Sequence, residues 1–176
     1  LVADSVGVGK TIEAGLILRE LQARSEVNSV LVICTKPLVV ENKWKDEMKR
    51  FDERFTQLDG KTFRYCIDEM DKEGAWPEEH MKTIVPFSLL DESAMYGTSG
   101  NGRGVTRQGL LDLDPPPRFD LVIVDEAHHA RNPDTSNYKL VRFFCEYAEA
   151  VIFLTATPIQ LGNDDLLVLL NLIRAD

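Results

Sequence analysis

A glycine-rich turn near the start of the chain could hold phosphate groups. It ends in Gly7-Val8-Gly9-Lys10-Thr11, between a short apolar segment and a predicted helix. Glycines let backbone N–H groups face phosphate oxygens, and the positive end of the helix dipole points at the same anion. Lys10 would reach the β- and γ-phosphates of a nucleotide, and the Thr11 hydroxyl would ligate Mg²⁺. The general P-loop pattern has glycine where this chain has Asp4. The alternative is a glycine-containing turn that caps a buried helix.

Two adjacent carboxylates directly follow an apolar run. Asp125 and Glu126 come after Leu121–Val124, and His128 and His129 follow them. Two acids after a strand often form only a turn or a helix start, and either histidine could be an ordinary surface residue. Beside a P-loop the carboxyl end of a parallel strand is where phosphates bind. Asp125 would then hold Mg²⁺, and Glu126 would polarise the water that attacks phosphorus.

A third group, Thr155-Ala156-Thr157-Pro158, ends another apolar run. Alone it indicates a strand followed by a proline turn. Its position after the phosphate-binding turn and the two acids favours a nucleotide-hydrolysing site built at one edge of a sheet.

The elements that would position these groups alternate between apolar strands and helices. We expect strands at residues 1–3, 30–34, 62–67, 83–85, 121–124 and 151–154, and helices at 11–24, 39–51, 136–148 and 164–173. This alternation predicts an α/β fold with a mainly parallel sheet and helices on both faces. Four glycines in residues 97–104 predict a flexible loop within a looser insertion near 91–118.

Length and composition limit the classes of protein to which the chain can belong. Its 176 residues suffice for one domain with a buried core, and the net charge of −9 excludes a polybasic nucleic-acid-binding arm. No apolar run approaches the roughly 18–20 residues of a membrane span. Three cysteines without a C-x-x-C pair favour a reducing, cytosolic setting. The chain opens with Leu1 and enters the phosphate-binding pattern at once, so we expect a piece of a longer protein.

In this order, the three groups resemble motifs I, II and III of superfamily 2 helicases. Further residues resemble the Snf branch of helicase-like translocases, which includes chromatin remodellers. The residues that carry this likeness are Thr11–Leu18, Leu31–Cys34, Pro37, Leu38, Trp44, Glu47, Thr157–Gln160 and Asp164–Leu166. Leu161 stands where the branch often has asparagine. The likeness is strongest to bacterial members, including the RNA-polymerase-associated ATPase group.

The resemblance covers residues 1–176 and implies only the first of two RecA-like lobes, a P-loop domain. It implies ATP and Mg²⁺ as ligands, with Lys10, Asp125 and Glu126 catalytic and Gly7, Val8, Gly9, Lys10 and Thr11 binding the nucleotide. It also implies that His128, Thr155 and Thr157 link nucleotide state to lobe closure. An arginine finger would come from the second lobe, so the isolated chain is expected to hydrolyse ATP negligibly.

The implied track is nucleic acid, and specifically double-stranded DNA, in a bacterial cytosol or nucleoid. Lys36 is the best candidate contact, although acids interleave the neighbouring basic residues as on an ordinary solvated helix face. Trp44 and Trp76 are of a type that more often packs than stacks on bases. Two alternatives remain: a small-molecule kinase, and a nucleotide-sensing or protein-docking module that keeps this lobe without cycling.

Overall fold

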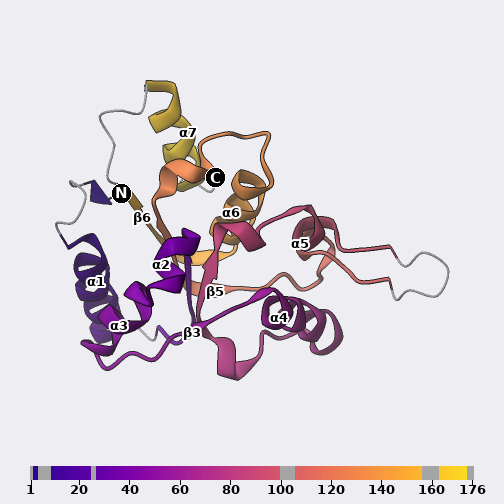
Figure 1. Cartoon of the computed structure of the whole chain (residues 1–176), viewed down its shortest axis with the longest axis horizontal. Coiled ribbons are helices and arrows are strands. Elements are labelled where there is room, and N and C mark those ends of the chain that lie inside the picture. Colours follow the sequence, from indigo (N-terminus) through magenta and orange to yellow (C-terminus); the bar gives the residue numbers. More distant parts are fainter. Residues whose placement is uncertain (1, 4–8, 25–26, 100–105, 156–162, 174–176) are drawn as a thin grey trace.

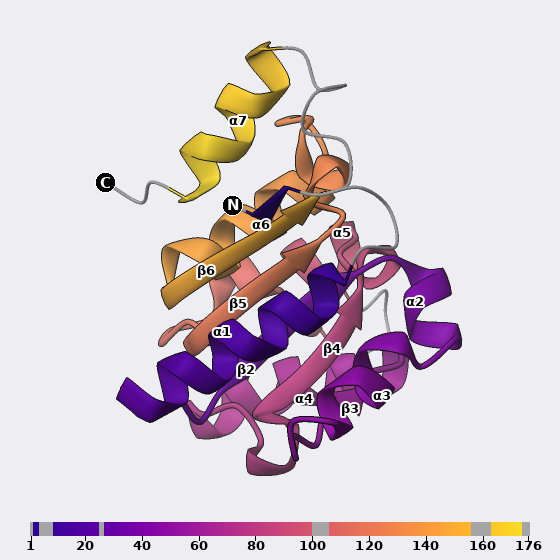
Figure 2. The same cartoon turned by 90° about the vertical axis from the view of Figure 1, so that its left-hand side faces the viewer.

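Six parallel strands form the centre of the part of the molecule that the structure describes. The computed structural model describes residues 2–3, 9–24, 27–99, 106–155 and 163–173. The strands lie in the order β1-β6-β5-β2-β4-β3 (Figures 1 and 2). Their bounds are β1 Val2–Ala3, β2 Val30–Cys34, β3 Thr56–Gln57, β4 Lys82–Pro86, β5 Phe119–Asp125 and β6 Ala148–Thr155. The expected parallel α/β architecture is therefore confirmed.

Helices cover both faces of this sheet, as the continuous apolar strands predict. One face carries α1 (Lys10–Arg24), α2 (Lys36–Val40) and α3 (Lys43–Lys49), and Figure 2 shows α1 lying across it. The other face carries α4 (Gly60–Glu73), α5 (Glu92–Tyr96), α6 (Ser136–Glu146) and α7 (Asn163–Ile173). Alternate residues of β2 supply the two cores: Val32 packs with the first group of helices, and Ile33 with the second. Short 3₁₀ helices lie at Glu78–His80, Phe87–Leu89, Leu110–Asp112 and Ala127–Ala130.

The strand expected at residues 62–67 is wrong, because this segment lies inside helix α4. Its buried residues are Phe63, Cys66, Ile67 and Met70, which have helical spacing. Asp59 caps the helix by accepting a hydrogen bond from the Thr62 N–H at 2.7 Å. Gly74 ends it in the left-handed conformation, with a φ of 69°. The apolar residues at 62–67 fit both a two-residue strand period and a helical period, and the helical period is the one that the structure follows.

The single helix expected at 39–51 is divided into α2 and α3. Asn42 stands between them with a φ of 55°, a conformation that asparagine tolerates better than most residues. The break turns the chain so that Trp44 and Met48 of α3 are buried. It therefore changes which side chains face the sheet.

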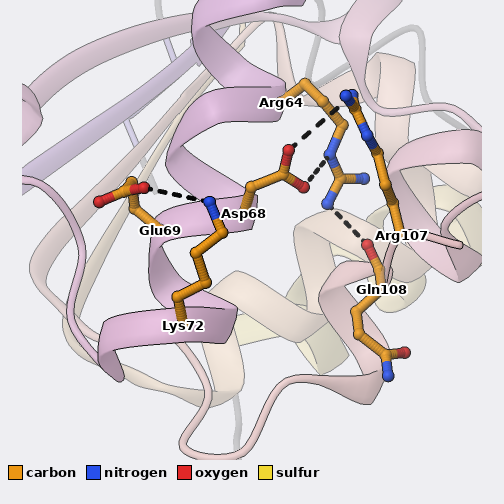
Figure 3. A network of polar contacts seen from close by, with 6 residues as sticks. All are labelled: Arg64, Asp68, Glu69, Lys72, Arg107 and Gln108. Carbon is orange, nitrogen blue, oxygen red and sulfur yellow. Dashed lines mark hydrogen bonds and ion pairs between the residues drawn. The ribbon is translucent and has the colours of Figure 1, made fainter. Parts of the chain in front are cut away.

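The insertion near 91–118 is held to the domain by polar contacts and by buried apolar residues. Residues Thr98 and Arg107 pair as antiparallel neighbours, on either side of the undescribed residues 100–105 (Figure 1). Figure 3 shows how α4 anchors this insertion: Arg64 donates to the Gln108 carbonyl at 2.7 Å, and Asp68 forms an ion pair with Arg107 at 3.8 Å. The expected flexible loop 97–104 falls mostly outside the described residues, and its described flank at 97–99 is hydrogen-bonded.

The strand order brings the three candidate groups to one edge of the sheet. Strand β6 lies between β1 and β5, with Ala3 opposite Thr155 and Leu154 opposite Asp125. The carboxyl ends of these three parallel strands therefore lie side by side. No described helix is long and apolar enough to cross a membrane. The three cysteines are buried and unpaired.

Candidate nucleotide-binding site

A cavity of about 190 Å³ opens at this edge of the sheet. The start of α1 and the residues after β5 form two of its walls, and α2 and α3 form the third. Its lining residues are Gly9, Lys10, Thr11, Ile12, Leu38, Lys43, Glu47, Asp125 and Glu126. The structure thus brings Lys10 and Thr11 together with Asp125 and Glu126, which lie more than a hundred residues away in the sequence.

The start of helix α1 gives one end of the cavity a positive character. Gly9 has a φ of 94°, and its carbonyl accepts the N–H groups of Ile12 and Glu13 at 2.8 and 3.0 Å. The side chains of Lys10 and Thr11 are buried, at 8% and 5% exposed. The ammonium group and the helix dipole add their positive charge at the same point. This combination favours an anion such as a phosphate group.

Asp125 is held by two donors on different oxygens. Its Oδ2 accepts the indole N–H of Trp44 at 2.9 Å, and its Oδ1 accepts the Glu126 N–H at 2.9 Å. Burial raises the pKa of Asp125 above its ordinary value, and the charge of Glu126 acts in the same direction. Burial and the Asp125 charge together raise the pKa of the neighbouring Cys34 thiol to about 12. The carboxylate is therefore a buried negative charge that a cation would stabilise.

Glu126 projects from a strained backbone position. Its φ is 52° and its ψ is 50°, which costs a residue other than glycine about 1 kcal/mol. Its Oε2 lies 3.3 Å from Nδ1 of His128. The His128 ring lies against that of His129, with centroids 4.4 Å apart, and burial together with His128 lowers the pKa of His129. The turn thus places Glu126 in the lining of the cavity, in contact with His128.

The donor set in the cavity fits Mg²⁺ bound together with a nucleotide. The Thr11 hydroxyl and the Asp125 carboxylate are hard oxygen ligands at one cavity. Within the described ranges, no three His, Cys, Asp or Glu residues gather as a metal cage. Mg²⁺ characteristically takes one or two protein oxygens and completes its shell with phosphates and waters. Thr11 and Asp125 would therefore hold the ion, and its chemistry there would be charge neutralisation on the phosphates.

The remaining candidate residues lie around the same edge. Thr155 is fully buried at the end of β6, between the strands that lead to Lys10 and to Asp125. Lys36 is exposed at the start of α2, directly beyond the carboxyl end of β2 and outside the cavity lining. Gly7, Val8 and Thr157 lie outside the described residues.

The third wall of the cavity was not predicted from the sequence, although Leu38 and Glu47 are among the residues that carry the family likeness. Leu38, Lys43 and Glu47 line it, and Trp44 reaches Asp125 from the same helix pair. Trp44 packs in the core, as expected, and also donates to the acidic site. The spacing of Trp44 and Glu47, one helical turn apart after a strand and a proline, was the available signal.

Comparisons with known proteins agree with this fold. The chain is 35% identical over 185 residues to the RNA polymerase-associated protein RapA of Actinobacillus pleuropneumoniae serotype 3 (strain JL03), covering all of this chain and 17% of RapA. It is 29% identical over 174 residues to the uncharacterized ATP-dependent helicase YqhH of Bacillus subtilis (strain 168), covering 99% of this chain and 26% of YqhH. The chain therefore spans about a quarter or less of these relatives.

Among solved structures, the Sulfolobus solfataricus SWI2/SNF2 ATPase core in complex with dsDNA matches with a TM-score of 0.66 at 21% identity. The match covers 97% of this chain and 30% of that one. The Pyrococcus furiosus Hef helicase domain matches with a TM-score of 0.59 at 22% identity, over 98% and 32% of the two chains. These likenesses show the RecA-like fold. A family model described as the SNF2-related domain matches residues 1–176. The chain therefore belongs to the SNF2-related domain family.

Proposed function

We propose that this chain is the ATP-binding lobe of a longer, nucleic-acid-dependent ATPase that moves along duplex DNA. The observation that carries the proposal is the single cavity into which Lys10, Thr11, Asp125 and Glu126 converge. Positive charge at the start of α1 suits the phosphates of ATP, and the carboxylates that line the same cavity suit Mg²⁺ and the attacking water.

Each residue has a distinct role in this proposal. Gly7, Val8 and Gly9 contribute backbone N–H groups to the phosphates, and Lys10 neutralises the β- and γ-phosphates. Thr11 and Asp125 hold Mg²⁺. Glu126 orients and polarises the water. Its Oε2 lies 3.3 Å from Nδ1 of His128, so the charge of Glu126 acts directly on that histidine.

Nucleotide state would reach the second lobe through the end of β6. Thr155 lies between the strand leading to the phosphate-binding turn and the strand leading to Asp125. A shift of either neighbouring strand would therefore displace Thr155. We extend this coupling role to Thr157 and His128. The arginine that stabilises the transferring phosphoryl group would come from the second lobe and would be worth about 10³–10⁵ in rate.

The proposed track lies beyond the cavity, where Lys36 is exposed at the same edge of the sheet. The relatives support this: one solved relative is a core in complex with dsDNA, and the RapA relatives are RNA polymerase-associated. A bacterial cytosol or nucleoid is the corresponding location. Because the chain carries a net charge of −9, contact with DNA must be local.

The decisive experiment is steady-state ATP turnover by the longer protein at fixed salt. Turnover is measured with no nucleic acid, and then with duplex DNA, single-stranded DNA or duplex RNA. We expect stimulation by duplex DNA, dependence on Mg²⁺, and a loss of about 10²–10⁴ in rate for Glu126→Gln. The matched control is Glu149→Gln, an exposed glutamate at the opposite end of β6.

The outcomes separate the alternatives. If only duplex RNA stimulated turnover, the proposed track would be RNA and not DNA, and the proposed ATPase would stand. Mg²⁺-dependent ATP binding without stimulation by any nucleic acid would overturn the translocase proposal in favour of a nucleotide-sensing or docking module.

A further inference from the structure

The indole N–H of Trp44 is bonded to the carboxylate that faces the nucleotide cavity. Trp44 is fully buried on α3, and its Nε1 lies 2.9 Å from Oδ2 of Asp125. We propose that Trp44 is a positioning residue that holds Asp125 in the orientation in which it ligates Mg²⁺. This inference rests on the proposed function, since it concerns the metal ligand of that site.

The two donors on Asp125 together fix the plane of its carboxylate. The bond from the Glu126 N–H to Oδ1 is local and constrains one oxygen only. The bond from Trp44 comes from 81 residues away and constrains the other oxygen. A carboxylate has about four acceptor positions, so both bonds leave lone pairs for a metal ion. Without Trp44 the carboxylate can turn about the remaining bond.

Trp44 itself is held in place by close packing between α1 and α3. Its ring lies in the core cluster that contains Leu18 of α1. At Gly15 the helices approach so closely that a Cβ atom would lie 2.3 Å from Cε2 of Phe51, just beyond α3. Helix α1 begins with Lys10 and Thr11. The same packing therefore holds the phosphate-binding end of the site and the donor to Asp125.

A simpler interpretation is that Asp125 only satisfies a buried indole N–H, which needs some acceptor. The chain offers a matched case for this interpretation. Trp76 is also buried, at 4% exposed, and its Nε1 donates to the His80 carbonyl at 3.0 Å. That acceptor is a backbone group, and neither residue lines the nucleotide cavity. A purely structural role would give both tryptophans the same phenotype.

The test compares Trp44→Phe with Trp76→Phe in the longer protein. Each change removes one buried N–H donor and keeps an aromatic ring. Binding of a fluorescent ADP is measured across a Mg²⁺ titration and in EDTA, with KM and kcat for ATP as a second readout. For Trp44→Phe we expect the Mg²⁺ concentration at half-maximal binding to rise about 10-fold, as for other residues that orient metal ligands, with unchanged affinity in EDTA. Trp76→Phe should match the wild type in both.

The controls distinguish failure of this inference from failure of the proposed function. If the affinity of the wild-type protein for ADP did not depend on Mg²⁺, the proposed site itself would be refuted. A wild-type Mg²⁺ response that is equal in both variants would refute only the positioning role. If Trp44→Phe also lowers the affinity for ADP in EDTA, the substitution has damaged the fold as well as the metal site. Trp44→Met is then measured, because methionine fills irregular core gaps without supplying a donor.

Discussion

Helix α1 packs closely against the segment that follows α3, and this packing leads to a testable prediction at Gly15. An alanine Cβ there would lie 2.3, 2.7 and 2.8 Å from three ring carbons of Phe51. Non-bonded carbons prefer about 3.5–4.0 Å, so the helices must separate by about 1 Å or the ring must leave. Either response disturbs the support of the candidate nucleotide-binding cavity.

Two opposing terms set the magnitude. Replacing glycine by alanine inside a helix favours folding by about 0.5–1 kcal/mol. Overpacking a core costs about 1–3 kcal/mol. Phe51 is only half-buried, so it can turn partly toward solvent and avoid the upper end of that cost. An overpacking cost of about 1.5–2 kcal/mol, less the gain in helix propensity, should lower the free energy of unfolding of Gly15→Ala by about 0.5–1.5 kcal/mol.

The assay is urea unfolding of the 176-residue chain in a double-mutant cycle with Phe51→Ala. Once the ring is removed, Gly15→Ala should become neutral or stabilising, with a coupling energy of about 1.5–2 kcal/mol. Gly60→Ala in α4 is the matched control, because its Cβ would meet only Leu89 Cδ2 at 3.7 Å, an ordinary contact. A Gly15→Ala chain as stable as wild type, with the same increment in both backgrounds, would refute the reasoning.

Three further predictions concern ATP turnover and two aspartates of β5, Asp120 and Asp125. On the proposed function the arginine finger comes from a second lobe, so the 176-residue chain by itself should show negligible ATP turnover; robust turnover that Lys10→Ala abolishes would contradict this. Burial acts to raise the pKa of Asp120, but the backbone N–H groups of Ser29 and Asn28 outweigh it and lower that pKa. Asp120 therefore adds stability above its unfolded pKa, so Asp120→Asn should cost about 1 kcal/mol at pH 7, allowing for solvent screening, and less toward pH 3 in urea unfolding. Burial raises the pKa of Asp125, so the sign is opposite: its stabilisation is complete below the unfolded value and lost as pH rises through the folded value. In unfolding experiments from pH 4 to pH 7, Asp125→Asn should gain stability relative to wild type as the pH rises. If the stabilities of the two proteins changed in parallel with pH, a cost of burying the Asp125 charge would be excluded.

The strands with continuous apolar runs were predictable because few local structures can bury every residue in such a run. β2 is buried at all five positions, and β5 is buried at six of its seven. The predicted phosphate-binding turn is likewise a contiguous pattern of glycines, lysine and threonine, of which the structure describes Gly9, Lys10 and Thr11. Where two periods competed, as at Thr62–Ile67, helix capping by Asp59 decided between them. The two-residue strand β3 carries too few residues for any pattern.

Local signals therefore determined the parallel α/β class and the identity of Lys10, Thr11, Asp125 and Glu126 as candidates. Tertiary structure alone decided that β6 lies between β1 and β5, which places Thr155 between the two halves of the site. It also decided that Trp44 meets Asp125 across 81 residues. Neighbouring residues encode backbone conformation directly, since their sterics and hydrogen bonds act within a few positions. Strand order and the close approach of α3 depend on packing all the helices against the sheet at once, and no short segment contains that information.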